Sequence, residues 1–233
     1  MSNFTKMNFN IINNDKNNYF IKINDKVART PKGNIIELPS LKLSKIILKE
    51  YKLYKNKIPS SIISPIRITN TAIDKIKLDY NHYLDQLSFY ANNDVICYFS
   101  KTPDELVKKQ KKLWMPLINL MKEIYNIDII YTSEIAAIKQ SKESLLLIRN
   151  ILTSLNNFQL AAISVLSQLT NSIIIPLVLV NGKITAKKAF ELSYLEEIYQ
   201  SSLWGKDEEA FNRLHGISLD IRDVNKYYGS VFE

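Results

Sequence analysis

Glycine, histidine and cysteine are scarce in this chain, and their scarcity excludes several kinds of active site. Its 233 residues include 5 glycines, 2 histidines and 1 cysteine. A phosphate-binding loop needs a glycine five residues before its Gly-Lys pair, but Leu177 holds that position before Gly182-Lys183. The glycines also lack the spacing of a dinucleotide-binding fingerprint, and no G-x-S-x-G motif is present. The sequence therefore gives no support for these classes of enzyme.

The residues that could bind a metal or form a disulfide are isolated from one another. His82 and His215 have no second His or Cys at ligand spacing, so we interpret both as surface residues. Cys97 cannot form an internal disulfide, and we expect it to pack as a small hydrophobic residue. The adjacent acids Glu196 and Glu197 would point about 100° apart on a helix, so they would not face one substrate. We expect no catalytic residue, no metal and no cofactor.

Signals for export or membrane insertion are also missing. The first ten residues, MSNFTKMNFN, have neither the apolar core of a signal peptide nor an arginine-rich presequence, which favours a cytosolic protein. Residues 150–182 carry no charge, but polar residues interrupt them, and their longest apolar run covers only residues 173–180. A membrane span needs about 20 apolar residues, so we expect buried helices there instead.

Charge is unevenly distributed along the chain. The net charge is +8, and residues 1–116 hold 20 Lys and Arg against 10 Asp and Glu, while the remainder is slightly acidic. Such a dipolar chain suggests a charge-complementary protein partner at least as well as nucleic acid. The basic run at Lys108, Lys109, Lys111 and Lys112 leaves a nucleic-acid-binding protein as the alternative function. An enzyme of unknown type is a third and weaker interpretation.

The front of the chain has the pattern of a small β-sheet. Residues 19–23, 26–30 and 35–38 are predicted strands of a meander, separated by turns at Asn24-Asp25 and at residues 31–34. Ser40 is the predicted N-cap of a helix over residues 41–54. Residues 58–65, with two prolines, form a connection, and we predict domains at 1–62 and 63–233.

The rest of the chain has mostly helical periodicity. Helices are expected at residues 67–76 and 80–91, after a capping box formed by Thr102, Pro103 and Glu105, from Ser141 to about residue 155, and from residue 158 through Pro176. Residues 127–131 are expected to be a short strand, and the tail after Gly216 a short or frayed helix. The predicted fold class is α+β, a small β-rich domain with one helix followed by a larger helical domain.

Residues 185–210 contain the most unusual helix. Thr185 is a good N-cap, and a single helix should run from residue 186 to about residue 203 before Gly205 ends it. Its surface is apolar on most sides, yet Glu196 and Glu197 interrupt it. These carboxylates either reach past their neighbours to water or await a partner outside the chain, because a carboxylate among apolar groups is costly unless it is paired.

Several short motifs are spread over most of the chain. They are NDKVARTP at residues 24–31 with Leu38-Pro39, TAID at residues 71–74, YA with DVICY at residues 90–98, Gln110 with Trp114 and Pro116-Leu117, and LEEIYQ at residues 195–200 with Trp204-Gly205. Their order and spacing together resemble one known family, the assembly chaperones for the catalytic head of ATP synthase that act on its α subunit. One departure is Ile198, where many relatives are expected to have a polar or acidic residue.

The resemblance implies a chaperone and not an enzyme. Members of this family bind newly made α subunit and keep it from aggregating until β subunit takes its place. The implied fold is a small α+β domain followed by an orthogonal helical bundle domain. Carried over to this chain, the partner-binding residues are Glu196, with Glu197, Gln200 and Trp204 beside it. The resemblance further implies a monomer that acts in the bacterial cytoplasm, as in α-proteobacteria, or in the mitochondrial matrix in eukaryotic relatives, without nucleic acid or membrane insertion.

Overall fold

The computed structural model describes residues 7–14, 18–54, 63–205 and 207–232. The chain forms two compact units. The first contains the chain up to Tyr80 together with Asn157–Ala162 and Lys226–Glu233, and the second contains Asn81–Asn156 and Ile163–Asn225. The domain boundary predicted after residue 62 lies at the end of segment 55–62, which is outside the described residues. That division stays a prediction, while the first compact unit extends to Tyr80.

An antiparallel sheet organises the first unit. Its strands are β1 (Phe9–Asn13), β2 (Tyr19–Ile23), β3 (Lys26–Val27) and β4 (Glu37–Leu38). β2 pairs with all three others, with β1 in the register Phe9↔Ile23. Asn24 and Asp25 both take positive φ, 48° and 63°, as the tight turn between β2 and β3 requires. The three predicted strand regions all contribute to the sheet, but the meander order was wrong, because β4 pairs with β2 and, among the described residues, only one bridge, Arg29↔Ile35, joins the second and third regions. β1 is an additional strand whose asparagines hid its alternation.

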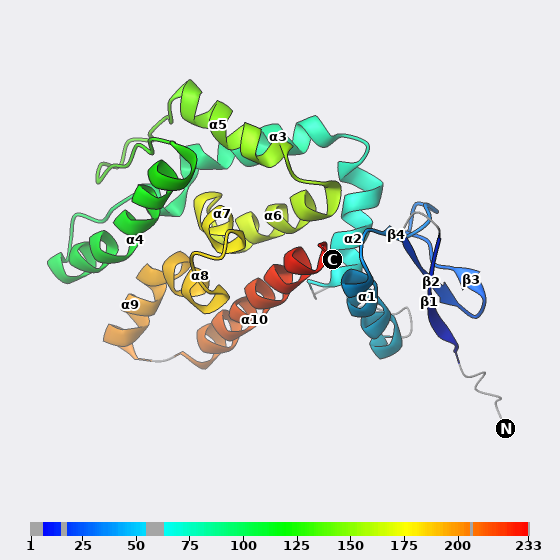
Figure 1. The fold of residues 1–233 in the computed structure, drawn as a ribbon. Coiled ribbons are helices and arrows are strands. Elements are labelled where there is room, and N and C mark those ends of the chain that lie inside the picture. Colours follow the sequence, from blue (N-terminus) through cyan, green and yellow to red (C-terminus); the bar gives the residue numbers. More distant parts are fainter. Residues whose placement is uncertain (1–6, 15–17, 55–62, 206, 233) are drawn as a thin grey trace. The chain divides into compact units, whose positions relative to one another are not determined.

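Helix α1 (Leu41–Tyr54) packs against this sheet (Figure 1). Ser40 caps it as predicted, because its Oγ accepts a hydrogen bond from the Leu43 amide at 3.0 Å. The apolar face of α1 is fully buried at Leu43 and Ile47. α2 (Pro65–Thr71) then continues directly into a π-helical turn, η1 (Ala72–Ile76).

The buried carboxylate of Asp74 on η1 ties that turn to the β3–β4 connection. Its Oδ1 accepts hydrogen bonds from Thr30 Oγ1 at 2.6 Å and from Asn34 Nδ2 at 2.7 Å. Burial raises the pKa of Asp74, but these bonds and the nearby Lys32 outweigh it and leave the pKa below its ordinary value. Two of the sequence motifs, at residues 24–31 and 71–74, therefore meet at one carboxylate.

Helices dominate the remainder of the chain. They are α3 (Tyr80–Phe89), α4 (Asp104–Tyr125), α5 (Lys142–Thr153), α6 (Asn157–Thr170), α7 (Ile174–Val180), α8 (Ala186–Ser193), α9 (Leu195–Trp204) and α10 (Glu208–Ser230), with short 3₁₀ turns η2 (Tyr90–Asn93) and η3 (Val95–Cys97). Six of the seven residues of α7 are buried, and α4 and α8 pack against it. The fold is α+β as predicted, a small sheet with helices followed by a mostly helical region. None of the described helices is long and apolar enough to cross a membrane.

A second aspartate is fully buried in the second unit. Asp94 Oδ2 accepts hydrogen bonds from Ser172 Oγ at 2.8 Å and from the Ile173 and Ile174 amides at 2.8 and 3.0 Å. Burial raises the pKa of Asp94 to about 6, although these bonds and one from the Ile96 amide oppose the rise. The carboxylate thus accepts hydrogen bonds from backbone amides at the start of α7 that have no partner within the helix.

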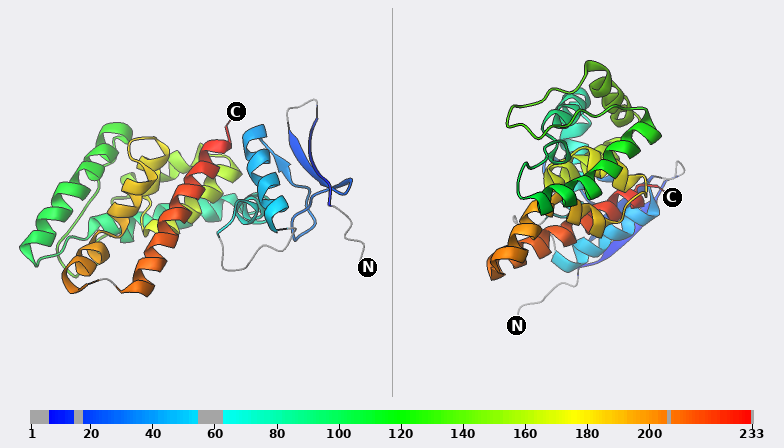
Figure 2. Two further views of the ribbon diagram at one scale, coloured as in Figure 1. Left: turned by 90° about the horizontal axis from the view of Figure 1, so that it is seen from below. Right: turned by 90° about the vertical axis from the view of Figure 1, so that its left-hand side faces the viewer.

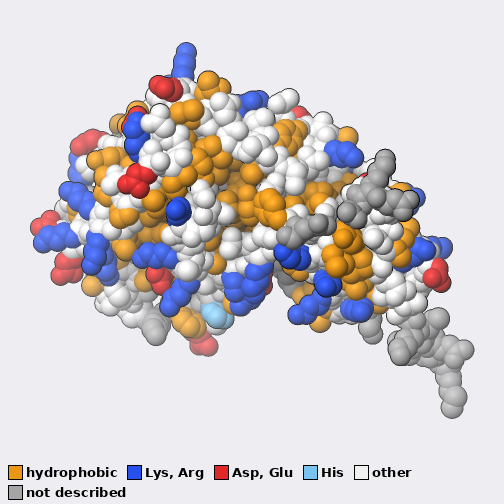
Figure 3. Space-filling model, in the orientation of Figure 1, with side chains coloured by type: hydrophobic (Ala, Val, Ile, Leu, Met, Phe, Trp, Pro, Cys, Tyr) orange, Lys and Arg blue, Asp and Glu red, His pale blue; other side chains and the backbone are white. Residues whose placement is uncertain are grey.

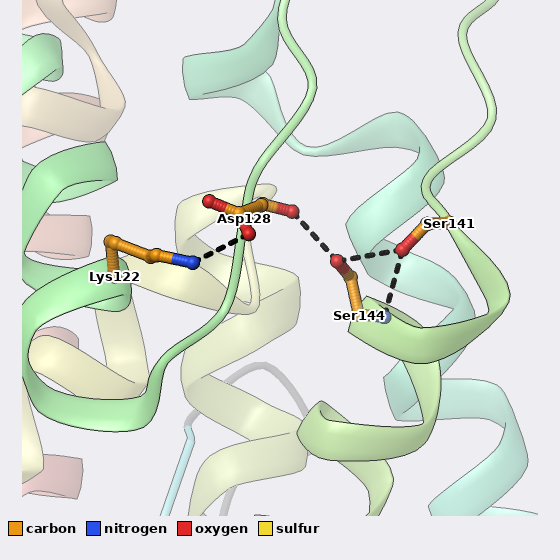
Figure 4. Close-up of polar contacts among 4 residues, drawn as sticks. All are labelled: Lys122, Asp128, Ser141 and Ser144. Carbon is orange, nitrogen blue, oxygen red and sulfur yellow. Dashed lines mark hydrogen bonds and ion pairs between the residues drawn. The ribbon is translucent and has the colours of Figure 1, made fainter.

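Residues 127–131 do not form the predicted strand. The Ser144 hydroxyl donates to the Asp128 carbonyl at 2.7 Å, while Lys122 pairs with the Asp128 carboxylate at 2.6 Å (Figure 4). The Gln140 amide group bonds to both the N–H and the C=O of Ile130, at 2.9 and 2.8 Å. Side chains therefore take the backbone groups that a neighbouring strand would have used.

Two expected single helices are each divided in two. Asn171, with φ 49°, ends α6 before α7 begins, so the helix from residue 158 does not run through Pro176. Tyr194, with φ −110° and ψ 24°, separates α8 from α9. At this second break the Ser193 hydroxyl bonds to the Ala189 carbonyl at 2.8 Å, a pattern that bends helices, and the Tyr194 hydroxyl is anchored on the Leu169 carbonyl at 2.9 Å.

Two helix ends also differ from expectation. Pro103 itself occupies the N-cap of α4, so Thr102 lies one residue outside and makes no capping bond. The tail is not short, because α10 is one continuous helix of 23 residues that includes Gly216 (Figure 2). Its length follows from a buried face that periodicity did not reveal, with Ile221 and Val224 almost fully inaccessible.

Candidate partner-binding site

Glu196 lies in the first turn of α9 with an exposed side chain. Its Oε1 accepts hydrogen bonds from Gln110 Nε2 at 2.6 Å and from Ser100 Oγ at 3.2 Å. Its described contacts are thus with neutral donors of its own chain. Part of the carboxylate still faces solvent and is available to a partner.

The amide that meets Glu196 belongs to a fully buried side chain. Gln110 is 0% exposed on α4, and its Oε1 also accepts a hydrogen bond from the Ser100 amide at 2.8 Å. One turn further along α4, the buried indole of Trp114 donates to the Leu192 carbonyl at 3.0 Å. The motif at Gln110 and Trp114 therefore anchors the end of α8 and the start of α9.

Glu197 forms an ion pair with Arg213 of α10. Both side chains are about half exposed, so the pair positions α9 and α10 more than it stabilises the fold. The hydrogen bond from Arg213 to Glu197 and the charge of that carboxylate raise the pKa of the guanidinium. Glu197 was predicted as a site residue, but the sequence did not reveal this cation as its partner.

Gln200 and Trp204 form the outer end of α9. The Gln200 Oε1 accepts a hydrogen bond from the Trp204 indole N–H at 3.2 Å, one turn apart on the helix. The indole is 84% exposed, which is unusual for the largest apolar side chain. Leu203, its neighbour in sequence, is also exposed, as is Ile198 six residues before Trp204. This end of α9 presents apolar area that nothing in the described chain covers.

Three of the four predicted site residues line one cavity. Glu196, Glu197 and Gln200 face a space of about 440 Å³ whose other walls include Trp114 and Tyr194. Both carboxylates therefore border this cavity, although their hydrogen-bond partners, Gln110 and Arg213, belong to different helices. Trp204 does not line this cavity.

The residues considered for other functions lie elsewhere on the surface. The four lysines between Lys108 and Lys112 are exposed on α4, and the Lys109 ammonium lies over the Tyr199 ring, 5.2 Å from its centroid. Lys and Arg side chains follow the left-hand edge of the face in Figure 3, with Asp and Glu among them. His82 and His215 are exposed, and within the described ranges no three His, Cys, Asp or Glu residues gather as metal ligands. Cys97 is buried and free, as predicted.

Exposed apolar side chains at one end of α9 and carboxylates in its first turn are the kinds of group found at protein–protein interfaces. Comparison with known proteins defines the class further. Residues 5–122 match the family model described as ATP12 chaperone protein, and the chain belongs to this family. The family resemblance inferred from the sequence is confirmed, and the family is that of the F1-ATPase assembly chaperones. The C-terminal motif with Glu196 lies beyond the residues that the family model matches.

Relatives of this chain occur in bacteria and in mitochondria. The mitochondrial protein atp12 of Schizosaccharomyces pombe is 26% identical over 204 residues, which cover 82% of this chain and 69% of the relative. The crystal structure of Atp12 from Paracoccus denitrificans has a TM-score of 0.84 and 25% identity, covering 96% of this chain and 95% of that one. The Atu1473 protein of Agrobacterium tumefaciens, a putative chaperone by its description, has a TM-score of 0.89 and 25% identity, covering 95% and 83%.

Proposed function

We propose that this chain binds the unassembled α subunit of the ATP synthase catalytic head, prevents its aggregation and hands it on to β subunit. The observation that carries the proposal is the exposed apolar end of α9, at Trp204 and Leu203, on a helix whose first turn carries two carboxylates. An unassembled subunit exposes surface that its neighbours normally cover, and such surfaces aggregate. A protein that covers them needs apolar contact area and a few charges that set register.

Each of the four site residues has a proposed role. Trp204 supplies apolar contact, and Gln200 orients its indole through the hydrogen bond between them. Glu196 offers the unpaired part of its carboxylate to a cation of the client. Glu197 holds α9 against α10 through Arg213. None of these roles includes a chemical step, so we propose a function without catalysis, in the compartment where the catalytic head is assembled, which is the cytoplasm in a bacterium.

Co-expression with the α subunit alone tests this function. The α subunit should remain soluble and co-purify with the tagged chain, and addition of β subunit should release it. Trp204→Ala should reduce the recovered α subunit, whereas Leu146→Ala, at a similarly solvent-exposed apolar position on α5, should not. Aggregation of the α subunit to the same extent with and without the chain would contradict the proposal.

A further inference from the structure

A second hollow lies beside α9, apart from the cavity that Glu196 lines. It has a volume of about 490 Å³ and lies between α8, α9 and α10. Its apolar lining includes Phe190, Ile198, Phe211 and Leu214. Because it is formed by three helices, it is a groove of the kind that accepts an apolar segment of another chain.

Small side chains keep this groove open. Ser201 and Ser202 from α9 and Ser218 from α10 lie among the larger apolar groups. Phe211 is 54% exposed, and its ring stacks on that of His215 with centroids 6.4 Å apart and planes 8° from parallel. Ile198 is 37% exposed on the facing helix. The apolar surface is therefore accessible to a partner.

The charges around the groove are acidic. Glu191 and Asp207 line it, and its described lining includes neither Lys nor Arg. Two basic side chains of these helices are paired with carboxylates, Lys188 with Glu191 at 3.7 Å and Arg213 with Glu197. An apolar floor with carboxylates at its edge is complementary to apolar side chains that have Lys or Arg beside them.

We infer that this groove binds an apolar segment of the client that is flanked by Lys or Arg side chains. The inference rests on the proposed function, because it assigns a second contact for the same client. α9 then lies between two client contacts. Ile198, Ser201 and Ser202 line the groove, and Glu196 and Gln200 line the cavity. The acidic edge favours such a segment over an apolar surface without charge.

Two matched pairs of variants test the inference with purified chain and unassembled α subunit. Phe211→Ser removes a groove side chain, and Phe89→Ser is its control, because Phe89 is 62% exposed on α3 and outside the groove. We expect Phe211→Ser to weaken binding about tenfold and Phe89→Ser to leave it unchanged, with equal melting temperatures. Glu191→Lys should weaken binding and reduce its salt dependence, whereas Glu123→Lys on α4 should not.

Cross-linking identifies the occupant directly. The only native cysteine is buried, so a Ser202→Cys variant can carry a single photo-reactive group at the edge of the groove. Mass spectrometry should then find cross-links to α-subunit peptides that combine apolar residues with Lys or Arg. A Leu146→Cys variant on α5 serves as the control and should give none.

The outcomes separate the inference from the function it rests on. If wild-type chain binds the α subunit and Phe211→Ser binds equally well, the groove inference is wrong and the proposed function stands. If wild-type chain does not bind the α subunit, both are wrong. If sedimentation shows a dimer that Phe211→Ser dissociates, the groove is a contact between two copies, and the inference is overturned.

Discussion

Reversal of the charge at Glu196 should abolish client binding with little effect on the fold. In Glu196→Lys the side chain no longer accepts hydrogen bonds from Gln110 and Ser100, a loss of about 2 kcal/mol for two bonds at an exposed acceptor. The Gln110 Nε2 keeps its second contact, with Ser100 Oγ at 3.1 Å, while the N–H that met Glu196 loses its acceptor. For a chain of this length the melting temperature should fall by about 4–8 °C.

The effect on binding should be much larger. If the client presents a cation to Glu196, the new lysine places like charges together, which costs several kcal/mol, and capture of the α subunit should weaken by at least about 100-fold. Glu196→Gln separates the two effects, because it keeps a hydrogen-bond acceptor and removes only the charge. Its melting should be close to wild type and its capture weaker. Unchanged capture by Glu196→Lys would refute this reasoning, and a melting temperature lowered by more than about 10 °C would assign Glu196 to the fold instead.

Three further predictions concern buried carboxylates and the basic helix. The pKa of Asp94 is raised from 3.8 to about 6. The protonated carboxyl therefore contributes about 3 kcal/mol to the free energy of unfolding below about pH 4, and this contribution is lost as the pH rises through 6. Urea midpoints should show this slope in wild type and lack it in Asp94→Asn. Asp74→Ala should lower the free energy of unfolding by about 2–4 kcal/mol. In urea unfolding, a double-mutant cycle with Thr30→Val should give a coupling energy of at least about 0.5 kcal/mol, and additive effects of the two substitutions would contradict this prediction. Gel shifts at low and high salt should show no tight binding of generic DNA or RNA through the lysines of α4, and strong salt-sensitive binding would revive the nucleic-acid alternative.

Local signals in the sequence were sufficient to place most helix starts. Ser40, Ser141 and Thr185 each cap the helix that was predicted to follow, with bonds of 3.0, 3.0 and 3.1 Å to backbone amides. The physical reason is that capping depends on residues within three positions of one another. The same holds for the turn at Asn24-Asp25, whose conformation is set by the turn residues themselves.

The errors arise where distant side chains compete for the backbone. At Ile130 the competing group is Gln140, and at Tyr194 the hydroxyl reaches the Leu169 carbonyl, 25 residues earlier. Periodicity contains no information on such contacts. In the site, the sequence selected Glu196 but not its partner Gln110, which is 86 residues away. Phe211 was missed because no helix was predicted between Gly205 and Gly216, where α10 begins.

The break at Tyr194 has a consequence for how tightly a client can be held. Only Leu195 and Tyr199 are buried in α9, whereas almost all of α7 is. A helix with so few buried contacts opens at a lower free energy than the core, and without a continuous ladder to α8 it can do so alone. A client that orders α9 on binding therefore forfeits part of the interaction energy as lost conformational entropy. That loss lowers the affinity and shortens the lifetime of the complex, which is what the proposed hand-over of the client to β subunit would require.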